Sequence, residues 1–77
     1  MKYIHLEYAG YVIFDKAQKH SDIASKFPKD NVLSAGFVNL NIEGEEQVQC
    51  HGESTSLRKS VDKEDEKWIY RRLSIYA

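Results

Sequence analysis

Cysteine is almost absent from this chain, which has one such residue, Cys50, among 77. A single thiol cannot form an intramolecular disulfide, and small secreted domains usually depend on several of them. The sequence therefore favours a reducing compartment. We expect a cytoplasmic protein.

Long hydrophobic runs are also lacking. The apolar residues near the N-terminus are interrupted by His5 and Glu7, so this segment has no apolar core of a signal peptide. No later segment approaches the roughly 20 apolar residues that span a bilayer. We expect neither export by that route nor insertion into a membrane.

The chain also lacks an excess of charge of one sign. It has eleven Lys and Arg residues and twelve Asp and Glu residues, which gives a net charge of -1. No overall field attracts the protein to nucleic acid or to an anionic membrane, so such a partner would have to meet a local patch. What is present is an ordinary globular composition, 42% hydrophobic and 30% charged. The length allows one core, and we expect a single α+β domain over residues 1–77.

The N-terminal segment alternates in hydrophobicity. Between residues 4 and 14 the even positions are apolar and the odd positions are mixed, a period of two that predicts a half-buried strand. A two-residue turn at Ala9 and Gly10 would put charged and apolar side chains on one face, so we expect one long strand bent at Gly10. A hairpin with a three-residue turn would keep the faces separate and stays open as an alternative.

A first helix is predicted from about residue 16 to 27. Asp15 followed by Gln18 approximates a capping box, and Pro28 disfavours helical backbone at the residue before it. Ser21 would cap a shorter helix, which is the alternative.

Two more strands are predicted at residues 32–42 and 47–51, joined by a short acidic turn. Pairing Glu43 with Gln47 sets Leu40 opposite Cys50 and separates an apolar face from a polar one. Apolar residues on both sides of Gly36 break this pattern. The start of that strand is therefore bulged or covered on both faces.

The C-terminal part predicts a second helix from about Val61, capped by Ser60 or Asp62. Trp68, Ile69 and Leu73 form its apolar stripe, so we expect Trp68 in the core. Residues 52–56 are expected to be a polar connection. The order strand, helix, strand, strand, helix indicates a two-layer α+β domain, with both helices on one face of a three-stranded, largely antiparallel sheet.

Catalytic and metal motifs are missing. The serines lack a G-x-S-x-G pattern, and His20 and Asp22 would point to different sides of a helix, with His20 at the edge of the core. Cys50 and His51 are neighbours on a strand, so their side chains project to opposite faces and cannot share an ion. We expect no catalytic residue, no metal and no cofactor.

Two surfaces are candidates for a macromolecular partner. The polar face of the hairpin would suit a protein, and its residues are Asn39, Asn41, Gln47, Gln49 and His51. A local basic patch would suit nucleic acid, and its residues are Arg58, Lys59, Arg71 and Arg72. We prefer the protein partner, because acidic residues lie between these cations and because five tyrosines and Trp68 supply interface anchors. A homodimer stays open as an alternative.

Three segments, Asn31–Val38, Cys50–Leu57 and Ser60–Asp65, look like parts of small proteins encoded in bacteriophages and prophages. The resemblance covers most of the chain and brings no assigned activity or cofactor. It implies an accessory protein that binds a host protein or a nucleic-acid complex. We therefore expect a non-enzymatic interaction protein, with a small nucleic-acid-binding or regulatory domain as the alternative.

Overall fold

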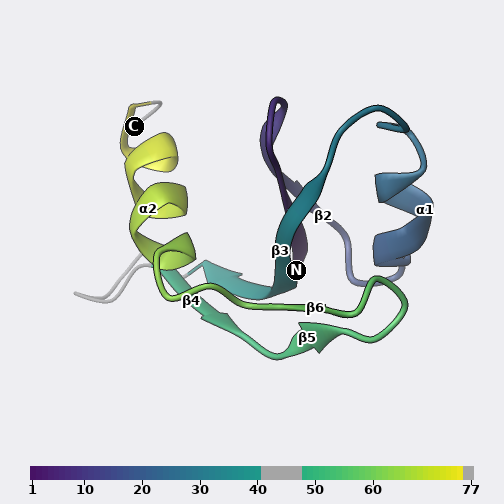
Figure 1. Ribbon diagram of the computed structural model, residues 1–77. Coiled ribbons are helices and arrows are strands. Elements are labelled where there is room, and N and C mark those ends of the chain that lie inside the picture. The colour runs from purple at the N-terminus through teal and green to yellow at the C-terminus, as the bar shows by residue number, and fades with distance from the viewer. Residues whose placement is uncertain (41–47, 76–77) are drawn as a thin grey trace.

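The computed structural model describes residues 1–40 and 48–75, with side chains described as far as residue 72. The expected α+β class is confirmed, with an antiparallel four-stranded sheet in the order β2-β1-β3-β4 and a separate β5-β6 pair (Figure 1). The elements are β1 (Lys2–Leu6), β2 (Gly10–Phe14), α1 (His20–Ala24), β3 (Val32–Leu40), β4 (Val48–His51), β5 (Glu53–Ser54), β6 (Lys59–Ser60) and α2 (Asp65–Ile75). The expected three-stranded sheet is wrong by one strand.

The extra strand arises because the N-terminal segment folds back on itself. Leu6 pairs with Gly10, so β1 and β2 are joined by a three-residue turn, and the expectation of one long strand is wrong. Gly10 has φ 85°, which suits glycine, and the carboxylate of Asp30 accepts hydrogen bonds from the backbone of Tyr8 and Ala9. The turn is thus tied to a distant part of the chain, a contact that local alternation does not reveal.

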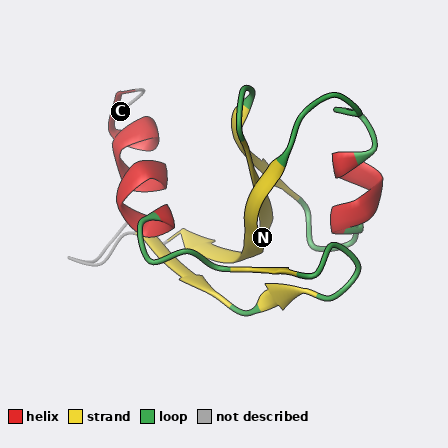
Figure 2. Ribbon diagram, in the orientation of Figure 1, coloured by secondary structure: helices red, strands yellow, loops and turns green. Residues whose placement is uncertain are grey.

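Helix α1 is shorter than predicted. The Asp15 side chain accepts a hydrogen bond from the backbone N–H of Ala17 at 2.8 Å, which forms a turn where the first helical turn was expected. The helix begins only at His20, with Lys19 at the N-cap position in place of Asp15 or Ser21. Long loops therefore flank this helix (Figure 2).

The β3–β4 hairpin keeps the predicted faces in a different register. Val38 pairs with Cys50 and Leu40 with Val48, so Leu40 does not lie opposite Cys50 as expected. The register differs by two positions from the predicted one, and side chains alternate with the same period. The separation into apolar and polar faces is therefore retained, while residues 41–47 lie outside the described residues.

The start of β3 is both bulged and covered on its two faces. His5 of β1 pairs with Ser34 and the next residue, Leu6, pairs with Val32, so Leu33 is the additional residue of a bulge. Ser34 and Ala35 point to opposite faces of the sheet and are both buried. The irregular hydrophobic pattern near Gly36 thus arises because this part of the central strand β3 is buried on both faces of the sheet.

Residues 52–56, expected as a polar connection, contribute one strand of the β5–β6 hairpin. The segment after β6 lies close to the sheet, because a Cβ added to Gly36 would come within 2.6 Å of the Val61 side chain. A glycine at position 36 therefore permits this contact. The hairpin also places Leu57 against the apolar residues near α1.

The two helices cover opposite faces of the sheet, so the expectation of both on one face is wrong (Figure 1). The α1-face cluster consists of Ile4, Leu6, Phe14, Ile23 and Ala35. The α2-face cluster consists of Tyr3, Val38, Val48 and Ile69. Because alternate residues of a strand point to opposite faces, the odd positions of β1, interpreted as mixed, face α2, where Tyr3 is fully buried and His5 is partly buried.

The orientation of α2 also differs from the prediction. Ile69 is fully buried whereas Trp68 is 46% exposed, so the placement of Trp68 in the core is wrong. Helix α2 begins at Asp65, later than the predicted start near Val61. Asp62, one of the two predicted caps, accepts a hydrogen bond from the backbone N–H of Glu64, which precedes the helix, so it forms a turn and not a helix cap. The side chain of Leu73 lies outside the described part of the chain.

Candidate functional site

The first residue of α2, Asp65, is a buried carboxylate with 1% exposure. It accepts a short hydrogen bond from the hydroxyl of Tyr3, a bond of 2.8 Å from the hydroxyl of Tyr11, and one of 2.9 Å from the backbone N–H of Asp62. Buried charged groups are tolerated where hydrogen bonds replace water. These three donors thus explain how a carboxylate is held between helix and sheet.

The β1–β2 register brings an imidazole to the same place. His5 is paired with Tyr11, and their rings stack with centroids 3.9 Å apart and planes 7° apart. The Nδ1 atom of His5 lies 3.9 Å from a carboxylate oxygen of Asp65, which exceeds hydrogen-bond length. We call Tyr3, His5, Tyr11 and Asp65 the Asp65 cluster.

Both phenols of the cluster are poor acids. Burial raises the pKa of Tyr3 and of Tyr11, and the hydrogen bonds to the negative Asp65 raise it further. The phenols therefore remain protonated donors at neutral pH. This arrangement serves to hold the carboxylate rather than to supply a phenolate.

A hollow of about 170 Å³ opens beside the Asp65 cluster, and we refer to it as the α2 hollow. His5, Tyr11 and Asp65 line it from the cluster. Leu33, the bulged residue of β3, and Trp68 of α2 also line it, with exposed fractions of 51% and 46%. The hollow thus combines polar groups with two large, exposed apolar side chains.

Ser34 also lines the α2 hollow and has an unusual hydroxyl. Its side chain is only 2% exposed, and its Oγ atom has no hydrogen-bond partner among the described residues. A buried polar atom in this state costs about 1–3 kcal/mol. The Ser34 hydroxyl is therefore an unfilled hydrogen-bonding group in the wall of the hollow, shielded from water.

Serine, histidine and aspartate thus line one hollow, as they do in hydrolases that use a catalytic triad. Such a triad needs the serine hydroxyl hydrogen-bonded to the imidazole and the imidazole to the carboxylate. Here the Ser34 hydroxyl is unpartnered within the described residues and the His5–Asp65 distance is 3.9 Å. The arrangement in this structure is that of a lined hollow and not of an assembled proton relay.

The predicted polar face of the hairpin is only partly described. Asn39 pairs with Gln49, and both are exposed, while the exposed ring of His51 stacks on Phe37 at 5.7 Å. Asn41 and Gln47 lie outside the described residues. The three described members share one face of the β3–β4 pair, as the sequence predicted.

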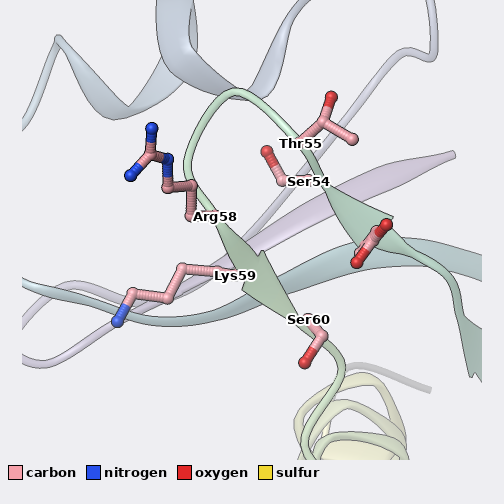
Figure 3. Close-up of a pocket in the computed structure, with 6 residues that line it drawn as sticks. Ser54, Thr55, Arg58, Lys59 and Ser60 are labelled. Carbon is pink, nitrogen blue, oxygen red and sulfur yellow. The ribbon is translucent and has the colours of Figure 1, made fainter.

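The predicted basic patch is divided between two places. Arg58 and Lys59 lie in the β5–β6 hairpin, next to the hydroxyls of Ser54 and Thr55, around an open hollow of about 370 Å³ (Figure 3). The turn of this hairpin lies toward α1, at the other side of the molecule from α2 (Figure 1). The four cations therefore do not form one surface.

The two arginines of α2 have separate contacts of their own. The guanidinium of Arg71 lies 5.1 Å from the centre of the Trp68 ring, and Arg72 donates a hydrogen bond of 3.1 Å to the backbone carbonyl of Tyr11. Arg72 thus ties the helix to β2. Arg71 instead extends the aromatic surface beside the α2 hollow.

No cluster of three metal-ligating side chains occurs within residues 1–40 and 48–75. Burial, opposed in part by a hydrogen bond with Tyr3, raises the pKa of the Cys50 thiol to about 11. A thiol in this state is a weak nucleophile at neutral pH. His20 is buried rather than at the core edge, and its Nε2 lies 2.9 Å from the carbonyl oxygen of Gly36.

The described helices include none that is both long and apolar enough to cross a membrane. Comparisons with family models, with curated proteins and with solved structures gave no match. The site is therefore interpreted from its own chemistry.

Sequence reasoning missed the Asp65 cluster. Asp65 was one of several acidic residues in the first turn of a helix, where acidic residues are usually solvated. The available signal was the mixed alternate face of the N-terminal segment, which carries Tyr3, His5 and Tyr11. Aromatic and imidazole side chains on a nominally wet face indicate burial against a polar partner.

Proposed function

We propose that this chain is a non-enzymatic interaction protein that binds a protein partner through the surface around the α2 hollow. The observation that carries the proposal is the exposure of Trp68 and Leu33, at 46% and 51%, on the lining of one hollow. Tryptophan is among the residues most often found at the energetic centre of protein interfaces. Exposed apolar side chains that lie together and are surrounded by polar residues are typical of interaction sites.

Other exposed apolar residues support this choice by contrast. Tyr8, 80% exposed, lies in the β1–β2 turn, and Met1, 52% exposed, lies at the N-terminus. Isolated apolar side chains of this kind are normal on protein surfaces. Trp68 differs because it shares a hollow with Leu33 and has the guanidinium of Arg71 over its ring.

The backbone that carries the surface is anchored to the rest of the fold. Trp68 precedes the fully buried Ile69 in α2, and Leu33 lies in the central strand β3, at the bulge opposite β1. The buried contacts of Asp65 anchor the start of the helix to the sheet. The resemblance to phage-encoded proteins supports an accessory role of this type, in the cytoplasm of a host cell.

The test is affinity capture from lysate of the native cell, with tagged wild-type protein and single variants in parallel. Trp68→Ala and Leu33→Ala should each lose a protein that the wild type retains, and Trp68→Ala should weaken the isolated complex by about 30-fold or more. Tyr8→Ala removes an exposed aromatic outside the hollow and should retain the partner. Retention of the same partner by Trp68→Ala would refute this surface.

Nucleic acid binding through the β5–β6 hairpin is the second candidate, favoured by the grouping of Arg58 and Lys59 with hydroxyls around one hollow. Treating half of each capture with nuclease separates the two. A protein retained after nuclease supports the proposal, whereas loss after nuclease, together with loss in an Arg58→Ala, Lys59→Ala double variant, supports the alternative.

A further inference from the structure

The chemistry of the α2 hollow points to the kind of side chain that it accepts, an inference that rests on the proposed function. Three of its lining residues are carboxylates, Asp62, Glu64 and Asp65, and no lysine or arginine lines it. The cap and first turn of α2 account for the presence of acidic residues there. They leave the hollow with an excess of negative charge.

The carboxylates differ in what they can offer to a ligand. Asp65 is buried and already accepts bonds from two tyrosines and a backbone N–H. One oxygen of Asp62 accepts a bond from the backbone of Glu64. Glu64 lines the hollow and is exposed, so its carboxylate can reorient toward an incoming cation.

A second observation indicates that the ligand carries hydrogen-bond donors. The Ser34 hydroxyl is buried, lines the hollow and is without a partner among the described residues. A hydroxyl oxygen has two lone pairs and can accept from an N–H group. A ligand that presents several donors would satisfy Ser34 and a carboxylate together.

The walls of the hollow are suited to a flat cation. The stacked rings of His5 and Tyr11 line one part and Trp68 lines another. The Trp68 ring has the cations of Lys67 and Arg71 at 5.5 and 5.1 Å from its centre, and an incoming guanidinium would compete with them for this ring. Aromatic faces attract cations, and guanidinium in addition stacks on them.

Size restricts the ligand to a single side-chain head group. Pockets for cofactors and drug-sized molecules span about 300–1,000 Å³. The α2 hollow, at about 170 Å³, is smaller than that range. We propose that it accepts the guanidinium of an arginine side chain of the partner protein, with Glu64 and Ser34 as acceptors and Trp68 as the stacking surface.

The test uses the single tryptophan of the chain as a reporter, because Trp68 lines the proposed site. Three blocked tripeptides, Gly-Arg-Gly and the same peptide with lysine or with neutral citrulline in the centre, are titrated into the full-length protein. The arginine peptide should shift the Trp68 emission saturably. The citrulline peptide should give no saturable shift, and the lysine peptide should bind several-fold more weakly.

Variants locate the site and control for charge. Glu64→Gln should weaken binding of the arginine peptide by about fivefold, and Ser34→Ala by about threefold, with thermal melts confirming that both variants are folded. Glu53→Gln removes the same charge from a residue of β5 that does not line the hollow, and should bind like the wild type. An equal response to arginine and citrulline, equal binding of the lysine peptide, or unchanged binding by Glu64→Gln would each overturn the proposal.

Failure of this inference can be separated from failure of the proposed function. If Trp68→Ala loses the captured partner while Glu64→Gln retains it at full affinity, the protein interface stands and the arginine assignment is refuted. If the arginine peptide binds with the stated variant pattern but no captured protein depends on Trp68, the hollow stands and the proposed interface is refuted.

Discussion

The two faces of the sheet are buried by different kinds of side chains. The α1-face cluster is made of aliphatic and aromatic side chains, with His20 as a buried polar residue whose Nε2 meets a backbone carbonyl. The α2-face cluster includes Tyr3 and lies beside a buried carboxylate held by three donors. The first face is stabilised by removal of apolar surface from water, and the second also depends on hydrogen bonds that have to be complete.

The comparison explains where a binding site can arise in so small a domain. Among the described residues, the α1-face cluster has no buried side-chain polar atom without a hydrogen-bond partner. On the α2 face the polar groups converge, one hydroxyl is left over at Ser34, and the bulged Leu33 is turned outward. The site thus results from the way in which polar and apolar side chains pack on the α2 face.

Loss of the central carboxylate should have the largest effect. In Asp65→Ala, the hydroxyls of Tyr3 and Tyr11 and the backbone N–H of Asp62 lose their acceptor, which should lower the free energy of unfolding by about 3–5 kcal/mol. Denaturant melts measure this loss. Glu64→Ala, which removes an exposed carboxylate one residue earlier, should cost less than about 0.5 kcal/mol, and equal losses in both variants would show that the buried bonds are unimportant.

Substitutions of two adjacent residues of α2, Trp68 and Ile69, test which of them belongs to the core and which to the proposed site. Ile69→Ala should lower the free energy of unfolding by about 2–4 kcal/mol because Ile69 is fully buried, whereas Trp68→Ala should cost about 1 kcal/mol or less. Thermal or denaturant melts of both variants decide this. A larger loss for Trp68→Ala would return Trp68 to the core and remove the main support for the proposed interface.

A third effect is expected at alkaline pH. The folded-state pKa values of Tyr3 and Tyr11 are raised by burial and by Asp65, so the unfolded chain releases these protons at lower pH than the folded one. The associated stability is fully present below about pH 10, the unfolded pKa of tyrosine, and is lost as the pH rises above it.

Denaturant melts across this range should therefore show a falling midpoint, with a shallower fall in Tyr11→Phe, which has lost one of the two phenols. That variant should also be less stable at neutral pH by about 1.5–3 kcal/mol, the value of one hydrogen bond to a charged acceptor. Absorbance of phenolate provides a direct check. Ionisation of all five tyrosines near pH 10 in the folded protein would contradict the raised pKa values of the cluster.

Features that depend on nearby residues were predictable from the sequence. The strands observed at 32–40 and 48–51 followed from alternation and a turn signal, and a second helix followed from the acidic residues near its start, although it begins at Asp65 and not near Val61. The faces of the β3–β4 hairpin were correct although the register was off by two, because side-chain orientation repeats with that period. Local chemistry thus sufficed where local pairing decides the structure.

Features that depend on distant residues were not predictable. Trp68 and Ile69 are adjacent, and only the sheet determines which of them turns inward. The three-residue β1–β2 turn is held by Asp30, which is 21 residues or more away along the chain. Asp65 is distinguished from its acidic neighbours only by tyrosines 54 and 62 positions away.

The length of chain between Tyr3 and Asp65 has a consequence for how the protein folds. Hairpins with short connections form early, whereas a contact across 62 positions must first close a long loop at an entropic cost. The carboxylate is therefore expected to meet its tyrosines after the folding transition state. Interactions that form after the transition state leave the folding rate almost unchanged and slow unfolding. The Asp65 cluster would then set the lifetime of the folded molecule, and with it the time for which the hollow persists.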